Sequence, residues 1–114
     1  MMVHRTMEES EFNEFAFWAN ETAKHALIKC SSGNLSHRVQ NNQMLISASG
    51  CWLSELTAKQ IAIFNIDDGT LINDIKPSAE HKFHLGIMQS RKEINTVLHF
   101  QSQAATTIAC MGIE

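Results

Sequence analysis

The chain has 114 residues, the length of one domain, and we expect a single unit over residues 1–114. Its 9 basic and 12 acidic residues give a net charge of −3, which excludes a basic nucleic-acid-binding arm. No apolar run approaches the roughly 20 residues of a membrane span, and the N-terminus lacks the apolar stretch of a secretory signal. Three widely spaced cysteines (Cys30, Cys51 and Cys110) exclude a disulfide framework and a CxxC zinc finger and favour a cytoplasmic protein.

The first half of the chain is predicted to contain one helix and two strands. Residues 10–29 carry Phe and Ala at helical spacing on one side and polar residues on the other, which is typical of a helix that packs on a core. A polar loop leads to a short strand over 35–39, and the Asn41-Asn42 pair indicates a turn. Residues 44–48 are predicted as a second strand, which ends at Ser49-Gly50.

Further along the chain, residues 54–60 favour a short helical turn and residues 61–66 favour a strand. The Asp67-Asp68-Gly69 sequence then predicts a hairpin that continues into residues 70–73. These hairpin signals indicate a largely antiparallel sheet.

The last part of the chain begins with an extended lead-in to Pro77, because the residue before a proline is disfavoured in a helix. Ser78 is predicted to cap a helix over 79–91. A buried strand over 96–101 and a helix of small residues over 104–111 complete the pattern. Helices on the faces of a mainly antiparallel sheet predict an α+β or layered α/β/α domain. Apolar residues run almost to the last residue, so we expect the sequence to be part of a longer fold.

Three short polar segments are candidates for binding an anion. Residues 32–36 (SGNLS) contain a glycine that lets backbone N–H groups approach a phosphate, and residues 47–50 (SASG) place hydroxyl and N–H groups at a strand end. Residues 77–80 (PSAE) begin a helix, where free N–H groups and the helix dipole favour negative charge. The alternatives are plain turns for the first two segments and simple stabilisation of the helix start by Glu80.

Several histidines raise the question of a metal site. His81 and His84 are three positions apart, whereas the histidines of helical zinc pairs are four apart, so we interpret both as ordinary partly buried or surface histidines. His99 and Gln101 are two apart on a strand, so their side chains share a face. A His-x-His pair at that spacing can chelate zinc, but an amide oxygen is a weaker ligand. A structural role for His99 is the alternative.

The order and spacing of four segments are more specific than any one of them. SGNLS, MLISASG, KPSAEHKFH and VLHFQSQAATTIA together resemble the N-terminal half of the class II aldolase/adducin family, and most closely its L-fuculose-phosphate aldolases. The resemblance implies a three-layer α/β/α sandwich around a mainly antiparallel sheet. It also implies a homotetramer, a phosphorylated sugar as substrate, and a divalent metal, usually zinc, held by three histidines and a glutamate.

The resemblance also assigns roles to individual residues. Glu80 takes the place of the catalytic glutamate, which is also a metal ligand, and His99 that of the first metal histidine. Gln101 stands where the family has its second metal histidine and would be a weak ligand. The implied phosphate site comprises Gly33, Asn34, Ser49, Gly50, Ser78 and Ala79. Ala79 can offer only its backbone N–H, because the aldolases have a second serine there.

The function implied by this resemblance is the metal-dependent cleavage of a ketose 1-phosphate, of the L-fuculose 1-phosphate type, to dihydroxyacetone phosphate and an aldehyde. The glutamate would move a proton on the carbon beside the carbonyl. Two alternatives within the family are epimerisation of a pentulose phosphate and dehydration of a thiosugar phosphate. A third is an adducin-like interaction domain without catalysis, which the glutamine at position 101 favours and the intact PSxE and SGN segments do not.

Overall fold

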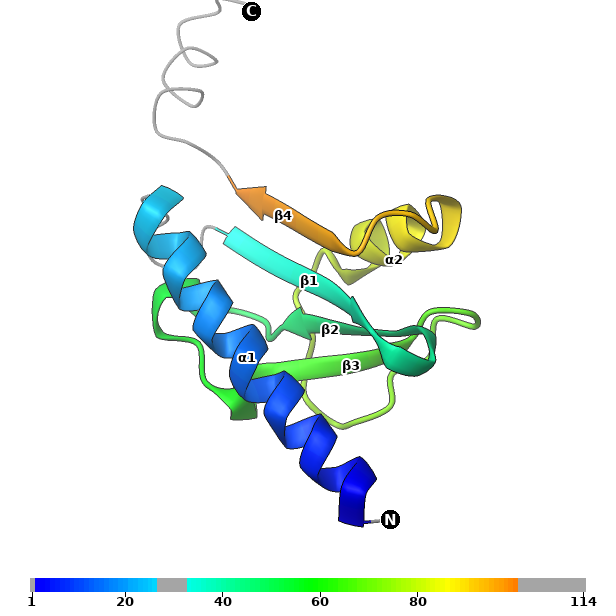
Figure 1. The fold of residues 1–114 in the computed structure, drawn as a ribbon. Helices are drawn as coiled ribbons and strands as arrows, with labels where there is room; N and C mark the ends of the chain where they lie inside the picture. Colours follow the sequence, from blue (N-terminus) through cyan, green and yellow to red (C-terminus); the bar gives the residue numbers. More distant parts are fainter. Residues whose placement is uncertain (1, 27–32, 101–114) are drawn as a thin grey trace, which may run out of the picture.

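The computed structural model describes the backbone of residues 2–26 and 33–100, with side chains from residue 9 onward. Two helices and four strands make up the fold: α1 (Met2–Ala26), β1 (Gly33–Val39), β2 (Gln43–Ser47), β3 (Ile61–Asn65), α2 (His81–Ser90) and β4 (Thr96–Phe100). Three single turns of 3-10 helix connect them: η1 (Gln40–Asn42), η2 (Leu53–Glu55) and η3 (Ala58–Gln60). Figure 1 shows β1, β2 and β3 as a meander, with β4 returning along the free edge of β1.

The sheet has the strand order β3-β2-β1-β4, and every neighbouring pair is antiparallel. The turn from β1 to β2 requires a left-handed backbone at Asn41 (φ 65°) and Asn42 (φ 55°), a conformation that asparagine tolerates better than most residues. Because β4 pairs with β1 rather than with β3, the start of β1 and the end of β4 meet at one end of the sheet.

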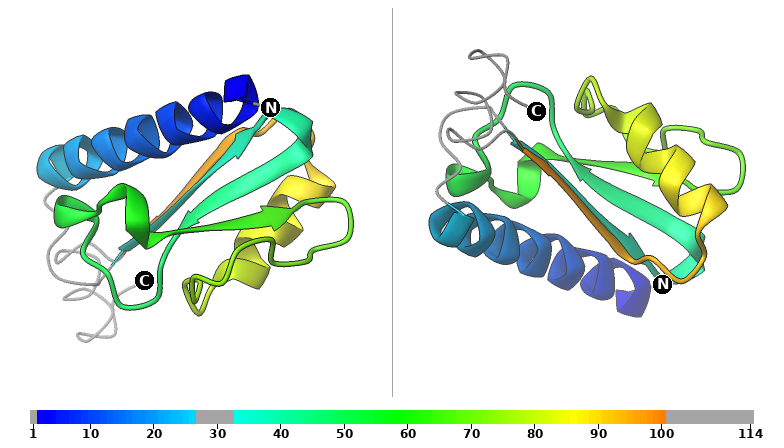
Figure 2. Two further views of the ribbon diagram at one scale, coloured as in Figure 1. Left: turned by 90° about the horizontal axis from the view of Figure 1, so that it is seen from below. Right: turned by 90° about the horizontal axis from the view of Figure 1, so that it is seen from above.

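The helices cover opposite faces of the sheet, as both views in Figure 2 show. On the α1 face, Phe15 and Ala19 of the helix pack with Leu35, Leu45 and other alternate strand residues in one buried apolar cluster. On the α2 face, the intervening strand residues form a second cluster with the helix residues Leu85 and Met88; its strand and loop members are Met44, Ile46, Ala62, Phe64 and Ile66. This arrangement confirms the predicted three-layer α/β/α sandwich.

The predicted elements appear with shifted ends. The first helix begins at Met2 instead of residue 10, because residues 2–26 contain no glycine or proline to stop it. The turn after β3 forms as predicted, with Gly69 at φ 74°, but it is followed by a single bridge between Phe64 and Leu71 in place of a paired strand. The last residues of the first predicted helix (27–29) and the predicted helix over 104–111 lie outside the described residues.

The second helix begins at His81 rather than at residue 79, so the prediction of Ser78 as its N-cap is wrong. Glu80 occupies the cap position, and the Ser78 hydroxyl accepts a hydrogen bond from the Glu80 N–H (3.2 Å). Pro77 explains the delay, because Ala48 and Pro77 form an antiparallel bridge that keeps this segment extended. Within residues 2–26 and 33–100, no helix is long and apolar enough to cross a membrane.

Candidate active site

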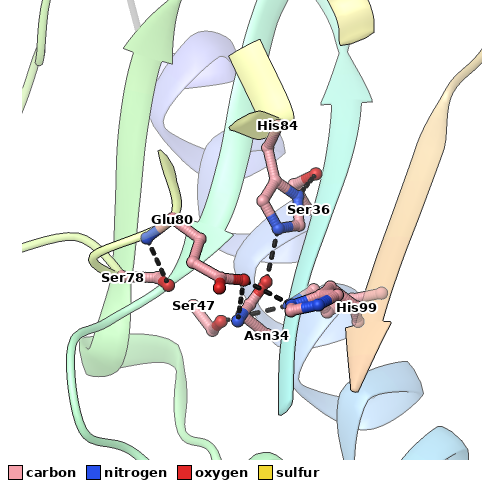
Figure 3. A network of polar contacts seen from close by, with 8 residues as sticks. Asn34, Ser36, Ser47, Ser78, Glu80, His84 and His99 are labelled. Carbon is pink, nitrogen blue, oxygen red and sulfur yellow. Dashed lines mark hydrogen bonds and ion pairs between the residues drawn. The ribbon is translucent and has the colours of Figure 1, made fainter. Parts of the chain in front are cut away.

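A cluster of polar side chains lies on the α2 face, at the end of the sheet where β1 begins and β4 ends (Figure 3). Asn34 and His99 are direct partners in the β1–β4 register, so their side chains leave the sheet on the same face. Glu80 reaches this point from the start of α2, and His84 follows it one helical turn later. Residues far apart in the sequence thus converge because the sheet register and the helix start fix their positions.

The Glu80 carboxylate lies against both Asn34 and His99. Its Oε1 accepts a hydrogen bond from the Asn34 amide nitrogen (3.1 Å) and is in contact with His99 Nδ1. The side chains of Glu80 and His99 remain 43% and 41% exposed, so a ligand can reach both. Sequence spacing alone did not require this contact, and the structure brings the predicted catalytic glutamate and the predicted metal histidine together.

His84 forms the buried support of the cluster. The side chain is fully buried, and both ring nitrogens are engaged: Nδ1 with Ser36 Oγ (2.6 Å) and Nε2 with Asn34 Oδ1 (2.5 Å). Burial lowers the pKa of His84 from 6.5 to about 4, the nearby Glu80 carboxylate opposes this shift, and His99 adds to it. The ring is therefore neutral at pH 7.

The segments predicted to bind phosphate gather at the same end of the sheet. The Ser78 N–H donates to the Ser47 carbonyl (3.0 Å) and the Ser49 N–H donates to the Lys76 carbonyl (2.9 Å), so the two loops are joined through their backbones. Ser49, Gly50 and Ala79 are exposed, and Gly50 adopts φ 74°. Gly33 begins β1 opposite Phe100. The side chain of Asn34, however, points to Glu80 and His84 rather than toward these loops.

His84, Ser36 and Ser47 make contacts in the cluster that their sequence patterns did not predict. The interpretation of His84 as an ordinary histidine missed its contacts with Ser36 and Asn34. Ser47 also supports β1, because its hydroxyl accepts a hydrogen bond from the Leu35 N–H (3.2 Å). A usable signal existed, since His84 is four residues after Glu80 on one helix face and Ser36 is two residues after Asn34 on one strand face. His81 fits its interpretation better, because its ring stacks on Phe64.

The donor set accounts for part of a divalent metal site. His99 Nδ1 is buried and has no hydrogen-bond partner among the described residues, although it lies against the Glu80 carboxylate. An imidazole nitrogen and a carboxylate oxygen so placed can both turn to one cation, and both are donors that zinc accepts. No group of three or more His, Cys, Asp or Glu side chains assembles within the described ranges, and Gln101 lies outside them. The described residues therefore supply two ligands of a site.

This geometry agrees with what comparison with known proteins finds. Residues 13–114 match the family model of the class II aldolase and adducin N-terminal domain. The chain belongs to the class II aldolase and adducin family. The predicted family resemblance is thereby confirmed, and members of this superfamily typically depend on a divalent metal and act on sugar phosphates.

Individual members of the family are similar along most of the chain. The 5-deoxy-D-ribulose 1-phosphate aldolase of Bacillus thuringiensis is 30% identical over 107 residues, which cover 93% of this chain and 50% of the relative. The 3-oxo-tetronate 4-phosphate decarboxylase of Haemophilus influenzae is 30% identical over 80 residues, which cover 70% of this chain and 38% of the relative.

Solved structures show the same fold. An L-fuculose 1-phosphate aldolase superposes with a TM-score of 0.74 at 27% identity, over 88% of this chain and 48% of that one. YgbL of Escherichia coli, a candidate aldolase, epimerase or decarboxylase, superposes with a TM-score of 0.79 at 25% identity, over 90% of this chain and 49% of that one. The class II aldolase-type domain described here thus spans about half the length of these structures.

Proposed function

We propose that this chain is part of a metal-dependent class II aldolase that cleaves a ketose 1-phosphate, of the L-fuculose or 5-deoxyribulose 1-phosphate type, to dihydroxyacetone phosphate and an aldehyde. The observation that carries the proposal is the position of the Glu80 carboxylate, which is held by the Asn34 amide, lies against His99 and remains partly exposed. The names of two similar relatives support this substrate class, because both are aldolases of 5-deoxyribulose 1-phosphate.

Glu80 is proposed to transfer the proton at the carbon beside the substrate carbonyl. In the direction of cleavage, the C4 hydroxyl loses its proton to solvent and becomes the aldehyde carbonyl as the bond between C3 and C4 breaks. The electron pair of that bond stays on C3, and protonated Glu80 delivers a proton there, so the proton lost at the C4 hydroxyl is balanced by the one added at C3 to give dihydroxyacetone phosphate. In the reverse direction the carboxylate removes that proton. The Asn34 N–H fixes the carboxylate for both directions without occupying its second oxygen. A divalent metal held by Glu80 and His99 would polarise the carbonyl oxygen that takes up the negative charge.

The phosphate site and the metal site are proposed to extend beyond this pair. Gly33, Ser49, Gly50, Ser78 and Ala79 lie at the same end of the sheet and offer hydroxyl and N–H groups to a phosphate. Gln101, two residues after His99, would add a weak third ligand, with zinc or another divalent ion bound. We also propose a homotetramer, as the family resemblance implies, and a cytoplasmic location, which the widely spaced cysteines favour.

A second candidate function is decarboxylation of a phosphorylated keto acid. Relatives from Haemophilus influenzae and Pectobacterium atrosepticum that are 30% and 32% identical are 3-oxo-tetronate 4-phosphate decarboxylases. Loss of carbon dioxide also leaves an electron pair on the carbon beside a carbonyl, so the same carboxylate could protonate it. The two candidates differ only in the group that leaves.

The first experiment is a turnover assay on the purified full chain, after its metal content has been measured by elemental analysis. We expect a bound divalent metal, and release of dihydroxyacetone phosphate from ketose 1-phosphates. Carbon dioxide released from a phosphorylated keto acid, with no cleavage of the ketoses, would select the second candidate. A chain that holds no metal after incubation with zinc, and turns over neither substrate, would contradict both.

The variant Glu80→Gln tests the role of the carboxylate. Removing a positioned acid–base group typically costs 10²–10⁴ in rate, so we expect kcat to fall by about that factor while the fold is retained. The matched control is Glu55→Gln, which changes an acidic residue in η2 outside the described cluster. Turnover by Glu80→Gln at the rate of the control would contradict the assignment. In a separate test, Gln101→His should tighten zinc binding if position 101 faces the metal.

A further inference from the structure

Asn34 is the central member of a chain of four polar side chains. Ser36 Oγ lies 2.6 Å from His84 Nδ1, His84 Nε2 lies 2.5 Å from Asn34 Oδ1, and Asn34 Nδ2 lies 3.1 Å from Glu80 Oε1. Figure 3 shows these contacts linking His84 through Asn34 to Glu80; Ser36 and His84 are buried, whereas Glu80 is partly exposed. Both the oxygen and the nitrogen of the Asn34 carboxamide are thus hydrogen-bonded to other side chains of the protein.

The donor and acceptor roles along this chain can be deduced. The Glu80 carboxylate only accepts, so Asn34 must present its NH₂ group to it. The Asn34 carbonyl oxygen then faces His84 and also only accepts, so the hydrogen of the imidazole is on Nε2. A neutral ring protonated at Nε2 has a free lone pair on Nδ1, so the Ser36 hydroxyl donates to it.

With an ionised carboxylate and a neutral ring, every other assignment leaves a conflict. If the Asn34 amide were rotated by half a turn, its oxygen would face the carboxylate of Glu80 and its NH₂ group would face a donor. If the hydrogen of His84 were on Nδ1, Nε2 would meet the Asn34 oxygen lone pair to lone pair. With Glu80 ionised and the His84 ring neutral, one proton arrangement therefore satisfies all four groups, and the Glu80 carboxylate, which can only accept, selects it.

We infer that His84 is a positioning residue for the proposed proton transfer, which with Ser36 locks the Asn34 amide so that its NH₂ group holds the Glu80 carboxylate in place. The inference rests on the proposed function of Glu80. It gives Asn34 a role other than the phosphate contact expected from its sequence motif. Ser36 and His84 are both fully buried, whereas Glu80 is partly exposed, so a rigid interior supports a reactive group at the surface.

The first test is spectroscopic and does not depend on activity. In the full chain labelled with ¹⁵N-histidine, the His84 signals are identified as those lost in His84→Gln. We expect a neutral ring at pH 7, with a protonated Nε2 and an unprotonated Nδ1. A ring protonated at Nδ1, or at both nitrogens, would overturn the inference. In Ser36→Ala we expect Nε2 to stay protonated, because the Glu80 carboxylate still orients the Asn34 amide, and the Nδ1 chemical shift to change, because the Ser36 hydroxyl no longer donates to it.

The second test separates positioning from phosphate binding. Loss of a residue that supports a catalytic group typically costs about 10- to 100-fold, so His84→Leu should lower kcat by that factor and leave KM within about twofold. His84→Gln is the rescue variant, because an amide NH₂ can still donate to the Asn34 oxygen, and it should recover most of the lost kcat. His37→Leu is the matched control, since His37 lies on the α1 face and contacts Thr96.

The outcomes separate this inference from the proposed function. A raised KM with unchanged kcat in His84→Leu would overturn the positioning role while leaving the aldolase assignment intact. Equal losses in His84→Leu and His84→Gln would overturn it as well. If His84→Leu does not fold, Ser36→Ala takes its place and must lower kcat severalfold. If the wild-type protein turns over no sugar phosphate, the proposed function fails, and the tautomer alone decides whether the Asn34 amide is locked.

Discussion

The two faces of the sheet are built from the same strands but differ in chemistry. On the α1 face, Leu35 and Leu45 pack with the Phe and Ala residues of α1 in a continuous apolar cluster. On the α2 face, the β2–β3 side of the sheet is equally apolar, whereas the β1–β4 side carries Asn34, Ser36 and His99. On the α2 face, the buried polar side chains of Ser36 and His84 lie next to the partly exposed Glu80 carboxylate and His99 imidazole.

The comparison shows how the apolar face determines the geometry of the polar one. Successive residues of a strand point to opposite faces, so burying Leu35 under α1 directs Asn34 and Ser36 toward α2. A register slip of one residue in β1 would exchange the two sets and remove the site. Hydrophobic packing on the α1 face therefore determines that the polar side chains of the site point to the α2 face.

The largest expected effect comes from breaking the apolar face. Leu45 is buried to 2% exposure within the cluster under α1, and truncating such a side chain typically costs about 2–5 kcal/mol. We expect Leu45→Ala to lower the free energy of unfolding by about that amount in urea denaturation. The kcat of the remaining folded protein should not change, because Leu45 does not touch the polar cluster. A folded variant with full stability but reduced kcat would contradict the division between the faces.

The second effect is a dependence of stability on pH, caused by the buried His84 on the α2 face. The pKa of His84 is about 4 in the folded protein and ordinarily 6.5, so between these values the unfolded chain binds more protons than the folded one. Stability should therefore be complete above pH 6.5 and fall as the pH drops toward 4, by about 3 kcal/mol from this group. Urea denaturation of the metal-free protein at several pH values measures the loss.

His84→Gln is the control for this pH dependence, because it removes the titrating group and keeps a polar side chain. The carboxylates titrate in both proteins, so the difference between the two curves isolates His84. Parallel curves between pH 7 and pH 4 would show that His84 does not contribute, and would contradict the depressed pKa. A difference with the opposite sign would mean that the folded state prefers the charged ring.

Much of the fold follows from the sequence, because its strands and turns are local patterns. Alternation and turn residues placed all four strands within two residues of their observed starts, and the asparagine pair marked the turn after β1. The helix starts were less predictable. The lack of a stop signal extended α1 to Met2, and the bridge made by Pro77, a tertiary contact, delayed α2 to His81.

The site was predictable only in part, for a physical reason. Spacing within one element indicates which residues share a face, and so it predicts a shared face for His99 and Gln101, of which Gln101 lies outside the described residues. The helix start and the family resemblance singled out Glu80. Spacing does not indicate which elements will be neighbours, and the contacts of His84 with Ser36 and Asn34 join a helix to a strand about 50 residues earlier in the chain. The spacings that pair His84 with Glu80 and Ser36 with Asn34 each lie within one element, so they do not show that the two pairs meet.

The smallest expected loss of stability comes from removing the side chain of Asn20, which joins α1 to the segment around η2 by hydrogen bonds. Asn20 is partly buried and donates to the carbonyls of Leu53 (2.7 Å) and Leu56 (3.4 Å), which joins α1 to the loop after β2. Asn20→Ala should lower the free energy of unfolding by about 1 kcal/mol, the usual net value of such a hydrogen bond, in the same urea assay. The His84 tautomer and kcat should stay unchanged, since no contact among the described residues joins Asn20 directly to the polar cluster. A change in the tautomer or in kcat would mean that the loop after β2, which carries Ser49, transmits strain from the apolar face to the site. The two faces would then be coupled through that loop as well as through strand register.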